Sequence, residues 1–119
     1  FIFKKPAPFL IDKTVRSCPP EILDKSLVPD GYERSNVWQF NPETTSKHLA
    51  PYPQQLSDRI VQYYSFVNDL VLDPFMGSGT TAISCLDHDR RYIGVEIHEE
   101  YVKMAKDRIA RHTPLKKFL

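Results

Sequence analysis

The sequence predicts part of a doubly wound α/β fold of the Rossmann type, preceded by an irregular, proline-rich N-terminal arm. Residues 71–81 (VLDPFMGSGTT) have the pattern of a strand that ends in a carboxylate, a tight glycine turn and a helix start. From residue 54 onward the apolar pattern runs helix, strand, helix, strand, helix, an order that implies parallel strands joined by right-handed crossovers. Most of the ten prolines interrupt regular structure before that point, namely Pro6, Pro8, Pro19, Pro20, Pro29, Pro42, Pro51 and Pro53.

Each element of the regular part has a local cause. Apolar residues at helical spacing predict an amphipathic helix over 54–65, and the short apolar run 70–73 predicts a strand in a sheet that is covered on both faces. A helix over 80–87 follows the glycine turn, and a strand over 91–96 follows a polar turn. A last helix is expected over 99–109. Its buried side is expected to consist of Tyr101, Val102, Met104, Ala105 and Ile109.

The N-terminal arm is expected to be mostly irregular. We predict a strand end at residues 1–3, an irregular segment through residue 33 and a short extended piece over 36–40. Trp38 in that piece is better explained as a core or lid aromatic than as a DNA-stacking residue. The chain thus divides into an arm (1–47), an α/β part (48–112) and a frayed tail (113–119).

Composition limits the class of protein. Sixteen Lys and Arg residues nearly balance fifteen Asp and Glu residues, so any DNA contact must come from local patches such as Lys4-Lys5 or from further polypeptide. Two cysteines are too few for a disulfide framework, and Cys85 is expected to be a buried thiol on a helix. With no apolar run of membrane length and no signal peptide, we expect a cytoplasmic protein. Because the sequence opens on Phe1, we expect it to be a piece of a longer polypeptide.

The chemistry concentrates between residues 73 and 96. Gly77 and Gly79 permit unusual dihedral angles and close approach of a ligand. Thr80 and Thr81 are expected to cap the helix that follows, whose start favours an anionic group. Glu96 lies about 20 residues beyond the glycines, where an acid binds ribose hydroxyls in such folds. Thr80 stands where a phosphate-binding P-loop requires Lys.

The glycine pattern alone leaves a dinucleotide site open, since Gly77-x-Gly79-x-x-Ala82 satisfies that form as well. Asp73 argues against it, because a carboxylate is unhelpful beside a pyrophosphate. S-adenosyl-L-methionine carries a sulfonium, an ammonium and a ribose but no phosphate, and it suits Asp73 and Glu96 better. The simpler alternatives are that Asp73 only forms the turn and that Glu96 is only an acid at a helix start.

These residues resemble the cofactor motif of the DNA amino-methyltransferases, which methylate N6 of adenine or N4 of cytosine. The resemblance is most specific over 71–81 and continues in 92–101 and in 48–53 (HLAPYP). It implies a Rossmann-like doubly wound methyltransferase fold, of which this chain is the C-terminal part. The segment order fits the subgroup in which the catalytic motif comes first and the cofactor loop last. Residues 10–35 fill the slot of the target-recognition region.

The catalytic tetrapeptide of that family, [Asp/Ser/Asn]-Pro-Pro-[Tyr/Phe/Trp], does not occur in the sequence. The Pro-Pro pair in 18–21 (CPPE) has neither the polar residue before it nor the aromatic after it, and we interpret it as a loop. We therefore assign no catalytic residue and expect this chain alone to be inactive.

The resemblance implies roles for twelve residues. Asp73 would contact the methionine amino group or order water there, and Phe75 would pack on the cofactor. Glu96 would hold the ribose hydroxyls and Ile97 would pack on the adenine ring. The others are Gly77, Ser78 and Gly79 (backbone contacts), Thr80 and Thr81 (helix start), and His48, Tyr52 and Gln54 (far side of the site). For His48, a solvent-exposed loop histidine is the simpler alternative.

The function expected is therefore an S-adenosyl-L-methionine-dependent, site-specific DNA methyltransferase of a restriction-modification type. Its partners would be double-stranded DNA and the N-terminal catalytic part, in the same protein or on a partner chain. Two alternatives remain open. One is a non-catalytic cofactor-binding subunit, and the other is a nicotinamide-dependent oxidoreductase that uses the Gly77-x-Gly79 turn.

Overall fold

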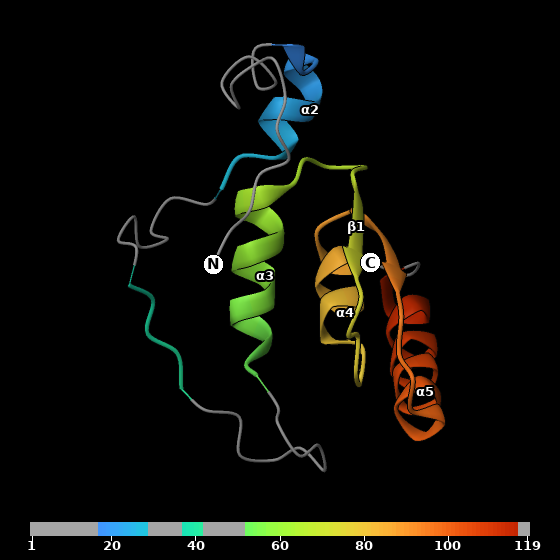
Figure 1. The fold of residues 1–119 in the computed structure, drawn as a ribbon. Coiled ribbons are helices and arrows are strands. Elements are labelled where there is room, and N and C mark those ends of the chain that lie inside the picture. Colours follow the sequence, from blue (N-terminus) through green and yellow to red (C-terminus); the bar gives the residue numbers. More distant parts are fainter. Residues whose placement is uncertain (1–16, 29–36, 42–51, 117–119) are drawn as a thin grey trace.

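The computed structural model describes residues 17–28, 37–41 and 52–116, with side chains as far as His112. These residues form α2 (Pro20–Lys25), α3 (Gln54–Tyr64), β1 (Leu70–Asp73), α4 (Thr80–Asp87), β2 (Arg91–Gly94) and α5 (Glu99–Lys116), as drawn in Figure 1. The predictions for residues 1–3, Lys4-Lys5 and His48 lie outside the described residues.

The two strands form a parallel pair, as predicted. Leu70 lies opposite Arg91 and Asp73 lies opposite Gly94. The predicted strand over 91–96 is two residues too long, because β1 offers no partner beyond Asp73. One further bond, from the amide of Val95 to the carbonyl of Asp73 (2.9 Å), closes the ladder at this edge. The described residues therefore confirm a partial α/β fold.

The helices match the predictions in order and differ at three boundaries. α3 ends one residue early, because Ser65 adopts an extended backbone (φ −145°, ψ 154°). α5 continues to Lys116, so the expectation of a frayed tail from residue 113 was wrong over its first residues. The loop predicted over 18–21 was also wrong, since α2 begins at Pro20 within the arm. Proline is well tolerated in the first helical turn, where its missing N–H has no partner to lose.

The core lies around α4, which contacts α3, α5 and β2. Its buried apolar residues are Val61, Ala82, Ile83, Cys85 and Ala105. The prediction for Cys85 is confirmed, and Ala105 is buried on α5 as expected. Met104 is exposed, so its predicted place on the buried side of α5 was wrong.

One face of the sheet is uncovered by any helix that the structure describes. Leu70, Leu72, Ile93 and Val95 alternate with inward residues along the two strands, and each is about half exposed or more. The apolar strand sequence predicted cover on both faces, and the described helices provide it on one only. The uncovered face marks where further polypeptide can pack.

Residues 37–41, which overlap the predicted extended piece, are not assigned to a strand. The Trp38 ring lies 5.4 Å from the ring of Tyr63 on α3, and the Arg59 guanidinium lies 5.2 Å from Trp38 and 5.0 Å from the Phe40 ring. These contacts support the interpretation of Trp38 as a packing aromatic.

Within the described ranges, no helix has the length and apolar character that crossing a bilayer requires. The same residues contain no group of three or more His, Cys, Asp or Glu side chains arranged to hold a metal ion.

Candidate cofactor-binding site

The loop between β1 and α4 turns twice through left-handed backbone. Gly77 has φ 53° and Gly79 has φ 87°, values that side chains other than glycine rarely adopt. The Gly79 amide bonds the Met76 carbonyl (3.0 Å), and Gly79 is the N-cap of α4. A Cβ on Gly79 would lie 3.1 Å from the Cβ of Ala105, so the turn also packs closely against α5.

The two threonines do not cap α4, contrary to our expectation from the sequence. No side chain caps this helix, because Gly79 occupies the N-cap position and the threonines follow it. Thr80 Oγ1 instead accepts a hydrogen bond from Arg108 Nη1 (3.0 Å). Thr81 Oγ1 shares one with the Tyr52 hydroxyl (2.9 Å). The hydroxyls thus connect the helix start to neighbouring segments.

Glu96 holds the glycine turn against the end of β2. Its Oε2 accepts the amide of Gly77 (2.9 Å) and its Oε1 accepts the amide of His98 (2.8 Å). These bonds, that from His98 first, lower the pKa of the Glu96 carboxyl and keep it ionised. A carboxylate has about four acceptor positions, so two such bonds leave it able to accept from a ligand.

Asp73 forms the turn that follows β1, which is the role that the simpler interpretation of this residue gave it. Its Oδ1 accepts the amide of Phe75 (3.0 Å), and the Met76 amide then bonds the Val95 carbonyl (2.9 Å). This role engages Oδ1 and is compatible with a ligand at the second oxygen. Turn formation and ligand binding are therefore not exclusive here.

Large apolar side chains follow the two strands at the same edge of the sheet as the carboxylates of Asp73 and Glu96. Phe75 and Ile97 are each 88% exposed, which is unusual for residues of this size. Both follow the ends of strands, Phe75 after β1 and Ile97 after β2. Together they offer apolar surface beside the two carboxylates.

A cavity of about 460 Å³ lies between α3 and β1 and reaches this edge. Tyr52, Asp73 and Thr81 line it, so the structure brings three of the predicted residues to one space. Its remaining wall is mostly apolar and includes Leu56 and Val71. Gly77 and Glu96 lie at the edge outside this cavity.

Gln54 is not directed to open space. Its Nε2 donates to Ser84 Oγ (2.6 Å) on α4, and its Oε1 accepts from Arg108 Nη2 (2.9 Å) on α5. Sequence reasoning missed Arg108 and Ser84. The one available signal was the position of Arg108 on the same side of the last helix as Ala105.

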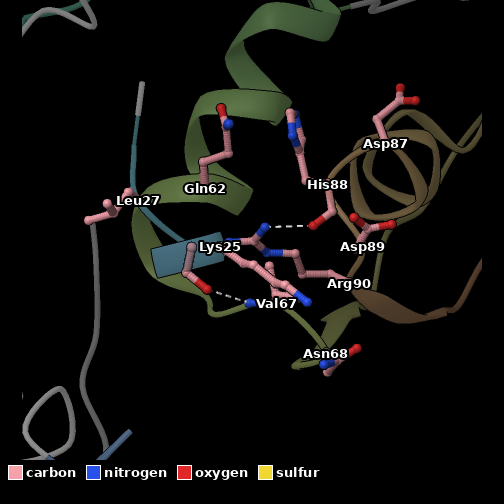
Figure 2. Close-up of a pocket in the computed structure, with 10 residues that line it drawn as sticks. Lys25, Leu27, Gln62, Val67, Asn68, Asp87, His88, Asp89 and Arg90 are labelled. Carbon is pink, nitrogen blue, oxygen red and sulfur yellow. Dashed lines mark hydrogen bonds between the residues drawn. The ribbon is translucent and has the colours of Figure 1, made fainter. Parts of the chain in front are cut away.

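A second cavity, of about 610 Å³, lies at the opposite, amino-terminal end of the strands (Figure 2). There Arg90 donates to the carbonyl of His88 (2.6 Å), and the Val67 amide donates to Ser26 Oγ (2.8 Å), which attaches α2 to this end. None of the residues predicted to bind the cofactor lines it. The candidate site is therefore at the carboxyl edge.

The family model of the N6/N4 DNA methylases matches residues 5–107. The chain belongs to this family. The match covers the glycine turn, Glu96 and most of the arm, and it confirms the resemblance drawn from the sequence. It favours a methyltransferase over a nicotinamide-dependent enzyme.

Curated members of the family give the same result. The chain is 41% identical over 83 residues to the type II methyltransferase M.SmaI of Serratia marcescens, covering 69% of this chain and 28% of that protein. It is 38% identical over 102 residues to M.HpaI of Haemophilus parainfluenzae, covering 73% and 32%. The chain thus spans about a third of the length of these relatives.

Solved structures of the family share the fold. A candidate DNA modification methylase from Thermus thermophilus matches with a TM-score of 0.67 and 34% identity, over 96% of this chain and 42% of that one. The same protein has been solved in complex with S-adenosyl-L-methionine, with a TM-score of 0.59 and 32% identity over 96% and 41%. The family therefore includes a member that binds this cofactor.

Proposed function

We propose that this chain supplies the S-adenosyl-L-methionine-binding part of a site-specific DNA methyltransferase acting on N4 of cytosine or N6 of adenine. The observation that carries the proposal is the Glu96 carboxylate, 2.9 Å from the Gly77 amide at the carboxyl edge of the parallel strands. Ligands of open α/β folds bind at this edge.

The side chains at this edge fit the cofactor chemically. Asp73 and Glu96 offer carboxylates to an ammonium group and to ribose hydroxyls. Phe75 and Ile97 offer exposed apolar surface for an adenine ring. No lysine or arginine stands in the turn to bind a phosphate, and this cofactor has none.

In the reaction, the bound cofactor supplies an activated methyl group, and the work of this chain is to bind and orient it. The target base of double-stranded DNA is flipped out of the helix into the site, because its amino group is otherwise inaccessible. Much of the rate then comes from holding nitrogen and methyl carbon in line and in contact. A DNA substrate in a bacterial cell implies the cytoplasm as the working compartment.

The base-binding half of the site is proposed to come from an N-terminal catalytic part, in the same protein or on a partner chain. The sequence lacks the catalytic tetrapeptide, and the chain spans about a third of the relatives. The uncovered sheet face and the cavity beside β1 support this division, because both offer apolar surface next to the cofactor edge.

Equilibrium binding of S-adenosyl-L-methionine to the intact protein tests the proposal. Asp73→Ala and Glu96→Ala should each lose most of the affinity, whereas Glu100→Ala, an exposed acid on the first turn of α5, should bind as the wild type does. Wild-type affinity in both site variants would refute the assignment.

A non-catalytic cofactor-binding subunit is the second candidate, favoured by the missing tetrapeptide alone. Transfer of a labelled methyl group to DNA distinguishes the two. Transfer by the intact protein excludes the subunit, and transfer only after a second polypeptide is added supports it.

A further inference from the structure

A polar network joins three helices at the base of the glycine turn. Arg108 of α5 donates from Nη1 to Thr80 Oγ1 (3.0 Å) and from Nη2 to Gln54 Oε1 (2.9 Å). Gln54 in turn donates from Nε2 to Ser84 Oγ (2.6 Å), with the Thr80 carbonyl at 3.3 Å. One guanidinium and one amide therefore hold the first turn of α4 from two sides.

The network continues along the contact between α3 and α4. Asp58 Oδ1 lies 3.3 Å from Gln54 Nε2 and 3.5 Å from His88 Nε2. Burial would raise the pKa of Asp58, but its hydrogen bonds, that from His88 first, hold the pKa below the ordinary value. The amide of Gln54 thus has polar partners on every side, and a ligand would have to displace one of them.

Packing on α5 reinforces the same contact. Ala105 is fully buried, and a Cβ on Gly79 would lie 3.1 Å from its Cβ and 3.8 Å from Ile109 Cδ1. Arg108 lies three residues beyond Ala105, on the same side of the helix. The apolar contact sets the distance of the turn from α5, and the guanidinium fixes its orientation.

We propose that Arg108 is a positioning residue for S-adenosyl-L-methionine, acting through Gln54 and Thr80 on the glycine turn. Glu96 fixes the turn at Gly77, and Arg108 fixes it just after Gly79. A backbone that meets a ligand loses affinity when it shifts by about 1 Å, so both anchors matter. The inference rests on the proposed function, and it assigns Gln54 to the support of the loop in place of the lining of the site.

Binding of S-adenosyl-L-methionine to the intact protein, well below its melting temperature, gives the first test. Arg108→Met keeps most of the side-chain length and removes the donors. We expect about tenfold weaker binding or more, as for loss of charge-assisted hydrogen bonds. The control Arg111→Met removes an exposed arginine on the same helix that bonds only the Asp107 carbonyl among the bonds described, and it should bind normally.

If Arg108→Met fails to fold, Arg108→Lys replaces it. An ammonium keeps the charge but cannot reproduce the planar fork that reaches Thr80 and Gln54 together, so weaker binding is still expected. Wild-type affinity in the variant that folds would overturn the inference. Absence of binding by the wild type would refute the proposed function itself.

A double-mutant cycle with Gln54→Met separates positioning from direct contact. If Arg108 acts through Gln54, the double variant should bind about as weakly as the weaker single variant. Losses that add would mean that the two residues act on the ligand independently, and would overturn the relay. A melting temperature alone cannot give this result, because a purely structural role leaves the affinity of the folded protein unchanged.

Discussion

Two charged side chains join loops at opposite ends of the same pair of strands. One of them is buried, and the other is partly exposed to solvent. At the amino end, Arg90 is 6% exposed and donates to the carbonyls of His88 (2.6 Å) and Ser65 (2.7 Å) and to Ser65 Oγ (3.2 Å). At the carboxyl end, Glu96 accepts two amides and remains partly exposed.

The difference separates Arg90, a structural anchor, from Glu96, a candidate ligand-binding group. Arg90 directs its donors to main-chain and hydroxyl oxygens away from water, so a ligand would have to displace bonds that already exist. Glu96 keeps acceptor positions open at an edge that also carries Phe75 and Ile97 in the open. A charged residue that supports a loop and remains accessible is the better candidate for binding.

Substitution of Arg90 should have the largest effect on stability. Arg90→Met in the intact protein leaves two carbonyls without their donors, each costing about 1–3 kcal/mol, so we expect a loss of about 3 kcal/mol in urea unfolding. The neighbouring Arg91→Met removes an exposed side chain bonded to the Asn68 carbonyl and should cost far less. Equal losses of stability in the two variants would mean that the buried Arg90 is no more a structural anchor than the exposed Arg91.

Gly94→Ala should have the second largest effect on stability. A Cβ there would overlap Met76 Sδ and lie 2.9 Å from its Cγ, so the whole methionine side chain must move. Overpacking of this kind costs about 1–3 kcal/mol, and the shift should also weaken cofactor binding because Met76 precedes Gly77. Adding Met76→Ala should restore much of the stability and much of the cofactor affinity. No recovery in the double variant would mean that the crowding is not the cause.

Glu96→Gln should affect binding more than folding. The amide keeps the shape of the side chain and loses its charge, and we expect about tenfold weaker binding of S-adenosyl-L-methionine with nearly unchanged unfolding. Because amide bonds lower the pKa of Glu96 in the folded state, wild-type binding should persist at pH values below the ordinary 4.5 of this carboxyl for as long as the fold does. Glu100→Gln is the matched control. A large loss of stability in Glu96→Gln alone would make Glu96 an anchor like Arg90.

The smallest effect is expected from Cys85, a buried residue whose carbonyl accepts the Arg90 amide (2.7 Å) near the amino end of the strands. Burial raises the pKa of its thiol from 9.0 to about 11. The unfolded chain therefore loses this proton at lower pH than the folded chain does, and stability should fall between pH 9 and 11, by about 1 kcal/mol at pH 10. In Cys85→Ala, the free energy of unfolding measured in urea should lack this part of its decrease between pH 9 and 11. An unchanged slope would indicate that water reaches the thiol.

Local patterns predicted the central part of the fold well. β1 and α4 have the predicted bounds because an apolar run, a glycine turn and a helix start each act over a few residues. The helix at Pro20 was not predicted, because closely spaced prolines disfavour helices in general, although the first helical turn accepts proline. α5 continues past Pro114 to Lys116, although the sequence predicted that the helix ends at residue 109.

The candidate site shows the same contrast between what local sequence predicts and what the packing of distant segments decides. Two parallel strands of equal reach bring Glu96 close to Gly77, whereas the sequence predicted only that both lie beyond the ends of strands, not the bond between them. Thr80 does not cap α4, because Gly79 occupies the N-cap position, and its hydroxyl instead accepts a hydrogen bond from Arg108, 28 residues away. Such a bond depends on how three helices pack, and no local pattern encodes that arrangement.

The unpaired side of β1 has a practical consequence for handling the protein. Its backbone groups have no strand partner among the described residues, and beside them Leu70, Leu72, Ile93 and Val95 form an apolar stripe. An open edge next to such a stripe is a template for aggregation between copies. Recombinant yield of this chain should therefore rise when it is co-expressed with the proposed N-terminal catalytic part, if that part covers the stripe and keeps the copies apart.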